Sequence, residues 1–174
     1  ISFGLESGNE NLRKTVIKKP NFTIDQDIKN LNLVKKYGIS FNVFNMVGFP
    51  EETADMVYDT IEVNHLVKPP YCQVGFFQPW EGVALRDYSI DKNYLSKNSK
   101  GLENSKDNLT STPMQNLLVD KSKLQHLHDK FQLYVYLDKM FWPLINFTEK
   151  NNFISKIIHN FLLRVLKLRF KFIN

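Results

Sequence analysis

Three short stretches of the chain combine residue types that could bind a ligand. Residues 4–8, with the sequence GLESG, place a carboxylate and a hydroxyl side by side, which suits ribose hydroxyls or an ammonium group. Residues 48–53, GFPEET, join a glycine that leaves the backbone open to a flat ligand with a proline that stiffens the chain. Residues 76–82, FFQPWEG, offer backbone groups that could read the edge of a base, with aromatic side chains as pocket walls.

Each stretch also has a plain structural interpretation. Glu6 could be a solvated loop acid, and Ser7 could cap a helix. Glu51 and Glu52 fall in a predicted first helical turn, where the helix dipole favours acids whatever the function. A short motif taken singly is more often structural than functional. Only the order of the three stretches along the chain can therefore distinguish the two interpretations.

The elements around these stretches alternate between strand and helix. Apolar and β-branched runs predict strands at 3–5, 39–47 and 71–77, with helical spacing between them. This alternation predicts an α/β fold with parallel strands. Because ligands bind at the carboxyl ends of such strands, the three stretches are expected at one edge of the sheet.

Capping signals define the helices between the strands. Thr23 with Gln26 forms a capping box, and Gly38 suits the left-handed residue after the same helix. The apolar stripe of that helix consists of Ile24, Ile28, Leu31 and Val34. Residues 52–67 are predicted as the next helix, ended by the two prolines that follow.

The composition changes after residue 88. Apolar spacing at 114–142 predicts a long helix that Pro143 ends. The last segment starts with helical spacing and ends with the alternating Leu168, Phe170 and Phe172, which would also fit a strand. The predicted organisation is an α/β part at 1–88, a polar linker or long loop at 89–112, an amphipathic helical extension at 113–150 and a cationic tail at 151–174.

The formal net charge of +5 belongs to the tail. Residues 151–174 carry five Lys and Arg side chains and no acid, so residues 1–150 are balanced. A basic isoelectric point with this origin does not indicate a nucleic-acid-binding fold, and no nucleic-acid partner is expected. The single cysteine, Cys72, excludes an internal disulfide and fits a reducing compartment, so a cytoplasmic location is expected.

The order of the motifs resembles the second half of the radical S-adenosylmethionine enzyme core. The matching sequences are ISFGLESGNENLRK at 1–14, FNVFNMVGFPEET at 41–53 and FFQPWEGVAL at 76–85. They are most similar to the subgroup with a cobalamin-binding domain, which includes anaerobic magnesium-protoporphyrin ester cyclases and cobalamin-dependent methylases. The resemblance implies that residues 1–88 form the C-terminal half of a TIM-like partial barrel.

The resemblance also implies which residues contact S-adenosylmethionine. Glu6 and Ser7 would face its ribose or methionine part. Met46, Val47 and Gly48 would line its adenine. The backbone groups of Phe76 and Phe77 would contact the edge of the adenine. Two positions depart from the family pattern, with Glu51 in place of a Gly and Val83 in place of a Thr.

The family's iron–sulfur cluster motif, Cys-x-x-x-Cys-x-x-Cys, is absent from this chain. Since cluster irons need thiolate ligands, Cys72 alone cannot hold a [4Fe-4S] cluster, and a small buried residue is its better interpretation. The resemblance therefore implies a fragment that is inactive alone. The cluster, any cobalamin and the rest of the barrel would belong to a missing N-terminal half. The parent would take electrons from a donor and act on a small-molecule substrate, by reductive cleavage of S-adenosylmethionine followed by hydrogen abstraction or methyl transfer.

A non-catalytic alternative rests on the tail. Residues 151–174 are cationic and amphipathic, so they could bind an anionic membrane surface or a partner protein, and the protein would then be peripheral to the membrane. The simpler interpretation is a final helix packed on the α/β part with solvated Lys and Arg side chains. Another class of nucleotide-binding α/β enzyme is disfavoured because no glycine-rich phosphate loop is present.

Overall fold

The computed structural model describes residues 1–19, 22–99, 111–150 and 152–173, with side chains described as far as Leu168. Its elements follow the chain in the order β1 (Ser2–Glu6), α1 (Glu10–Leu12), a π-helical turn (Arg13–Ile17), α2 (Ile24–Lys36), β2 (Asn42–Val47), α3 (Ala54–Val67), β3 (Tyr71–Phe76), α4 (Ala84–Asp91), α5 (Lys121–Tyr136), a 3-10 turn (Lys139–Phe141), α6 (Trp142–Phe147) and α7 (Phe153–Ile173). Among these residues, no helix is long and apolar enough to span a bilayer.

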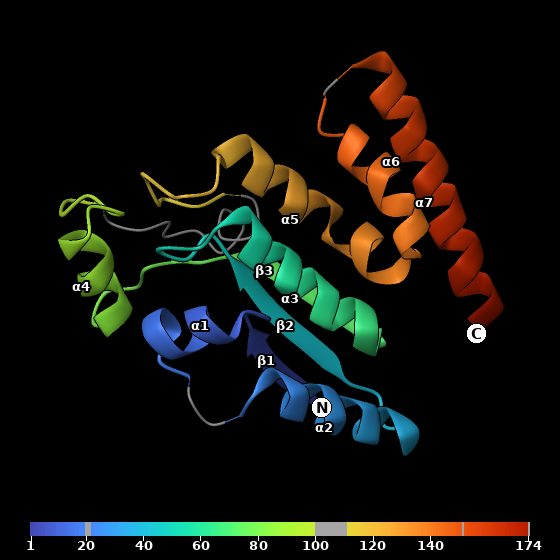
Figure 1. Ribbon diagram of the computed structural model, residues 1–174, viewed down its shortest axis with the longest axis horizontal. Helices are drawn as coiled ribbons and strands as arrows, with labels where there is room; N and C mark the ends of the chain where they lie inside the picture. The colour runs from blue at the N-terminus through green and yellow to red at the C-terminus, as the bar shows by residue number, and fades with distance from the viewer. Residues whose placement is uncertain (20–21, 100–110, 151, 174) are drawn as a thin grey trace.

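The three strands form one parallel sheet in the order β1-β2-β3 (Figure 1). The α/β class and the parallel pairing predicted from the sequence are confirmed. α2 connects β1 to β2 and α3 connects β2 to β3. Because all three strands run the same way, their last residues, Glu6, Val47 and Phe76, lie at one edge of the sheet.

Side chains alternate between the two faces of the sheet. On β2, Val43, Asn45 and Val47 are buried, whereas Phe44 and Met46 are not. The register aligns Val43 with Cys72 and Val47 with Phe76, so these residues share the face that the helices cover. On the other face, Phe44 and Met46 line a hollow. Met46 also packs against a smaller apolar cluster that includes Leu12 of α1.

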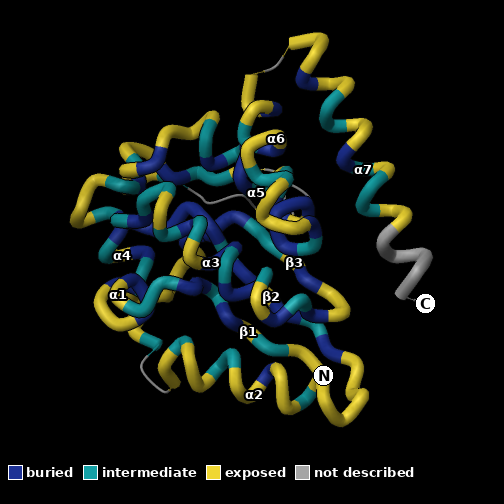
Figure 2. The backbone as a smooth tube through the Cα atoms, turned by 45° about the vertical axis from the view of Figure 1, so that its right-hand side comes forward, coloured by how far each residue is buried: buried dark blue, intermediate teal, exposed yellow. Residues whose placement is uncertain are grey.

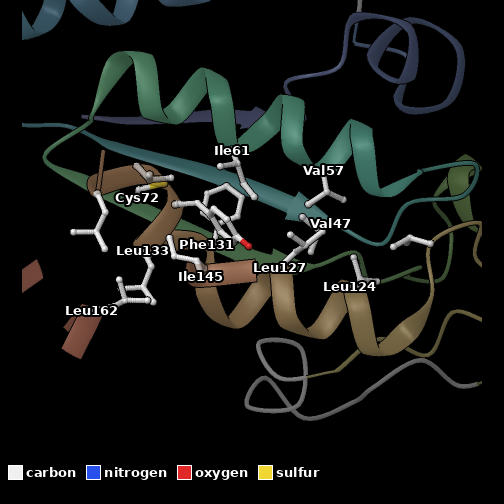
Figure 3. Close-up of a cluster of buried hydrophobic side chains, with 14 of the residues drawn as sticks. Val47, Val57, Ile61, Cys72, Leu124, Leu127, Phe131, Leu133, Ile145 and Leu162 are labelled. Atoms are coloured by element: carbon white, nitrogen blue, oxygen red, sulfur yellow. The ribbon is translucent and has the colours of Figure 1, made fainter. Parts of the chain in front are cut away.

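The main core lies between the sheet and the helices α3 and α5. Side chains from α3 and α5 point toward one another beside β2 (Figure 3). Ile61 of α3, Phe131 of α5 and Val47 of β2 are almost completely buried there. The cluster extends to Ile145 of α6 and Leu162 of α7, so helices from the last third of the chain complete the core of the sheet.

The capping predictions for α2 are confirmed, whereas Asn9 rather than Ser7 caps α1. α3 begins at Ala54 with Thr53 as its N-cap, so Glu51 and Glu52 precede its first turn. Thr23 and Gln26 form both hydrogen bonds of the capping box at the start of α2, and Gly38 has a φ of +67° just after α2. Leu31 is the buried centre of the predicted stripe, with Ile24, Ile28 and Val34 packed around it.

Two boundary predictions were wrong in the C-terminal half, and one open alternative is decided there. The helix expected at 114–142 begins only at Lys121, where Asp120 caps it, and it ends at Tyr136. Pro143 does not end a helix but lies in the first turn of α6, where its missing N–H is not needed. The final segment is helical to Ile173, so the alternation at 168–172 is not a strand.

The predicted linker is partly ordered. α4 extends to Asp91, within the segment expected to be a polar linker or loop at 89–112, and the backbone from 92 to 99 and from 111 is irregular. The part of that prediction covering 100–110 lies outside the described residues.

Candidate functional site

A hollow of about 1510 Å³ opens on the sheet face that carries Phe44 and Met46. It extends to the carboxyl ends of all three strands, where Glu6, Phe77 and Gln78 line it. α5 and α7 contribute a further wall through residues such as His128 and His159. The hollow therefore joins segments that are far apart in the sequence.

Glu6 is the acidic group at the end of β1. Its backbone is in the left-handed region with a φ of +67°, and its side chain is half-buried. Burial raises the pKa of the Glu6 carboxyl, while the nearby positive charges of Lys19 and Arg13 oppose that rise. The Lys19 Nζ lies 3.9 Å from Glu6 Oε1. A partly desolvated carboxylate at the rim is suited to accept hydrogen bonds from ligand hydroxyls.

The floor of the hollow is apolar and aromatic. Phe44 and Met46 of β2 present their side chains to it. Beyond the strand ends, the rings of Phe49 and Phe77 stack at 4.9 Å between centroids with an interplanar angle of 28°. Trp80 lines the same region and is half exposed. Such a surface fits the face of a flat ring.

Gln78 is a site residue that the sequence analysis did not single out. Its side chain is 9% exposed, and its Nε2 donates to the carbonyl of Ser111 at 3.0 Å. Its Oε1 is buried and has no hydrogen-bond partner among the described residues. The Gln78 side chain borders the hollow. An unpaired buried acceptor is costly, so an N–H donor that reached this atom would stabilise it. The only sequence signal was a glutamine directly after the strand predicted at 71–77.

Glu52 builds the loop after β2. Its side chain is fully buried, and its Oε2 accepts hydrogen bonds from the backbone N–H groups of Gly48 and Phe49. Desolvation raises the pKa of the Glu52 carboxyl to about 8, although both backbone donors oppose the rise. The turn closes with Glu52 N donating to Phe49 O at 3.2 Å, and Glu51 takes a φ of +62° inside it.

That turn shows how a residue other than glycine is accommodated at position 51, where the motif that the sequence resembles carries glycine. Glu51 stands where a type II turn normally carries glycine, because the third turn residue needs a positive φ. Its carboxylate accepts a hydrogen bond from the Tyr88 hydroxyl of α4. This contact raises the pKa of Tyr88 to about 12. The side chain therefore connects the loop to α4.

Four of the seven residues assigned to the cofactor from the sequence line the hollow: Glu6, Met46, Phe76 and Phe77. Phe76 borders it at the end of β3, although its side chain also belongs to the core on the helix-covered face. The ring of Phe76 packs against His128 at 4.2 Å between centroids. The N–H of Phe77 donates to the Val47 carbonyl at 2.8 Å, so this backbone donor is already used within the protein.

The other three assigned residues lie elsewhere. Ser7 is fully buried, accepts a hydrogen bond from Asn9 N at 3.1 Å and lies 3.4 Å from the Thr60 hydroxyl of α3. Val47 is in the core on the helix-covered face, because neighbours in a strand point to opposite sides and Met46 faces the hollow. Gly48 is not a lining residue, and its N–H is bonded to Glu52.

Cys72 does not fit a metal ligand. It is a buried member of the core, and burial raises the pKa of its thiol to about 12. Its Sγ bonds to Asn64 Oδ1 at 3.2 Å, within a buried network that also includes Asn45. The described residues contain no group of three His, Cys, Asp or Glu side chains arranged to hold a metal ion. The residues present here therefore do not fit a [4Fe-4S] cluster.

Comparison with known proteins connects the chain to one curated relative. No family model matches the sequence. The chain is 30% identical to an uncharacterized methyltransferase of Pyrococcus horikoshii over 95 residues, which are 55% of this chain and 20% of the relative. The matched part thus spans about a fifth of the relative's length. The relative is described only as a methyltransferase, so the iron–sulfur cluster, cobalamin and barrel implied by the motifs gain no support from it.

Proposed function

We propose that this chain binds the adenosyl part of S-adenosylmethionine in the hollow, as one part of a longer methyltransferase-related protein. The observation that carries the proposal is the meeting of three groups at the carboxyl ends of the strands: the Glu6 carboxylate, the apolar floor with Met46, and the unpaired Gln78 Oε1. The similarity to a methyltransferase supports it, because S-adenosylmethionine is a common methyl donor.

Different residues of the chain would bind different parts of the cofactor. Met46 and Phe77 would hold the adenine ring by apolar contact, and Gln78 Oε1 would accept from its exocyclic amine. Glu6 would accept hydrogen bonds from the ribose hydroxyls or face the ammonium group of the methionine part. When bound, S-adenosylmethionine supplies either an electrophilic methyl group or, after one-electron reduction, a deoxyadenosyl radical.

The finer part of the proposal is radical chemistry in the parent protein. It rests on the ordered motifs at 1–14, 41–53 and 76–85. The cluster cysteines, the remaining barrel strands and any cobalamin site would come from other parts of the parent, because this chain holds only Cys72. The chain alone is then inactive. A parent gene without a Cys-x-x-x-Cys-x-x-Cys motif upstream of Ile1 would overturn the radical proposal and leave cofactor binding to be tested separately.

Calorimetric titration of the whole chain with S-adenosylhomocysteine tests cofactor binding. We expect Gln78→Leu to weaken binding about tenfold, because the amine loses its acceptor. The S-inosyl analogue carries an oxygen in place of the adenine amine. It should bind the wild-type chain more weakly than S-adenosylhomocysteine does, and it should bind wild type and Gln78→Leu with equal affinity. Asn32→Leu, an exposed amide on α2, is the matched control and should bind like wild type.

Two results would contradict the proposal. One is the absence of binding by the folded wild-type chain. The other is an equal affinity of Gln78→Leu and Asn32→Leu for S-adenosylhomocysteine, which would mean that the unpaired acceptor does not contact the base.

A further inference from the structure

α7 presents two different faces along its length. Ser155 and Leu162 are buried against the rest of the protein. The opposite side leaves large apolar side chains in solvent, with exposed fractions between 51% and 77%: Phe153, Ile154, Ile157, Phe161 and Leu168. α7 lies at the periphery of the molecule, and exposed residues recur along its tube (Figure 2). The part of the chain that the structure describes therefore leaves this stripe uncovered.

The exposed apolar side chains share one side of α7. Ile157, Phe161 and Leu168 are separated by four and seven residues, which places them in one row of an α-helix. Arg164 belongs to the same row by its spacing. Lys156 and Lys167, eleven residues apart, form a neighbouring row and are exposed. The apolar row is thus bordered by cationic side chains along the helix.

The charge of this segment has one sign. Residues 151–174 contain five Lys and Arg and no Asp or Glu, and they account for the whole formal net charge of +5. A one-sided stripe of Phe, Ile and Leu beside a cationic row is the pattern of a helix that lies in the interface of an anionic bilayer. Self-association by a two-fold axis along the same stripe would bring the like charges of both copies together.

We propose that α7 binds the surface of an anionic membrane, with its apolar row in the headgroup region and Lys156, Arg164 and Lys167 facing the lipid phosphates. This inference is independent of the proposed cofactor binding, because the apolar row that it uses lies outside the hollow. It assigns a surface to a helix whose apolar face is not covered by the described residues.

Flotation of the whole chain with vesicles of phosphatidylcholine and about one third phosphatidylserine tests the proposal. We expect binding at about 0.1 M salt, little binding at about 0.5 M salt, and little binding to pure phosphatidylcholine, because salt shortens the range of the charge attraction. The triple variant Lys156→Gln, Arg164→Gln, Lys167→Gln should bind about a hundredfold more weakly, at about 1 kcal/mol for each cation. The double variant Ile157→Ser, Phe161→Ser should also lose binding.

Matched controls remove the same groups from other surfaces. Lys29→Gln, Lys36→Gln, Lys121→Gln removes three exposed cations, and Leu33→Ser, Leu66→Ser removes two exposed apolar side chains. Both controls should bind like wild type, and circular dichroism should show that every variant is folded.

Each other outcome overturns the proposal. Absence of binding at low salt excludes the membrane. Equal binding to pure phosphatidylcholine, or equal losses in the α7 and control cation variants, removes the specific electrostatic part. Dimerisation in sedimentation without vesicles, abolished by Ile157→Ser, Phe161→Ser, would assign the stripe to a second copy of the chain.

Discussion

Glu52 has a side chain that could bind a ligand, but in the structure it stabilises a loop. It belongs to one of the three candidate ligand-binding segments, residues 48–53, yet its carboxylate accepts hydrogen bonds from the N–H groups of Gly48 and Phe49. Those two donors keep the loop after β2 closed, and the cost is a fully buried acid with one oxygen that has no partner among the described groups. The residue therefore makes the stability of the fold sensitive to pH.

The free energy of unfolding should fall as the pH rises through the window from about 4.5 to about 8. The pKa of Glu52 is raised to about 8 in the folded chain, so the unfolded chain releases this proton first and is favoured as the pH rises. The contribution of the protonated Glu52 carboxyl to the free energy of unfolding is fully present below the ordinary pKa of 4.5 and is lost by about pH 8. The loss from this group is expected to be roughly 3 to 5 kcal/mol.

Urea unfolding of wild type and Glu52→Gln across this range measures the effect. The glutamine variant should lack most of the decline, and Glu51→Gln, which alters the neighbouring acid, should retain it. Parallel pH profiles for wild type and Glu52→Gln would show that Glu52 does not titrate in this window.

At the scale of elements, the turn after β1 is fixed by direct contact with α3. Gly8 N donates to the Thr60 hydroxyl at 2.8 Å, and Ser7 lies beside the same hydroxyl. A Cβ on Gly8 would lie 2.6 Å from the Asp59 carbonyl oxygen and from Thr60 Cα, which are backbone atoms that cannot move away easily. The GLESG motif therefore includes a packing requirement, in addition to the acid that faces the hollow.

Gly8→Ala should destabilise the chain by about 2 to 3 kcal/mol, because the added methyl group separates the turn from α3. Thermal and urea unfolding measure the loss. Gly38→Ala is the control: its φ is +67° but no atom lies within 4 Å of the added Cβ, so it should cost only about 1 kcal/mol through backbone strain. Equal losses in both variants would mean that the contact with α3 contributes nothing.

At the scale of the whole molecule, the sheet depends on helices that follow it by many residues. Phe131 and Leu127 of α5 complete the core of β2 and α3, and Leu162 of α7 joins the same cluster (Figure 3). The parts predicted at 1–88, 113–150 and 151–174 consequently share one core. We expect them to unfold together.

Phe131→Ala should lower the free energy of unfolding by about 3 to 5 kcal/mol, because it leaves a cavity between α5 and α3. Hydrogen exchange of the strand amides of Val43 and Val47 should accelerate by the same free energy if the sheet and α5 are one cooperative unit. Unchanged exchange at these strand amides, with faster exchange limited to α5, would contradict a shared core.

Much of the local structure could be predicted because it depends on neighbours in the sequence. The capping box of Thr23 with Gln26, the left-handed Gly38 and the parallel α/β order all follow from short-range hydrogen bonds and apolar periodicity. The start of α5 was placed too early because the apolar spacing continues into the irregular segment before Asp120, whose side chain caps the helix.

The residues of the candidate site could be predicted from the sequence only in part, for a different reason. A motif shows which residues are near a strand end, but the pleat decides which of them face the ligand, so Met46 lines the hollow and Val47 joins the core. Gln78 gained its interest only when folding buried its Oε1 without a partner.

The sequence by itself determined the strands, the caps and the all-cationic last segment, since these depend on local conformation and on composition. Only the tertiary structure decided that Glu52 closes a loop, that Gly8 touches α3, and that α7 leaves an apolar row uncovered. The physical reason is that burial and contact arise between residues far apart in the chain, and they become defined only when the helices pack against the sheet.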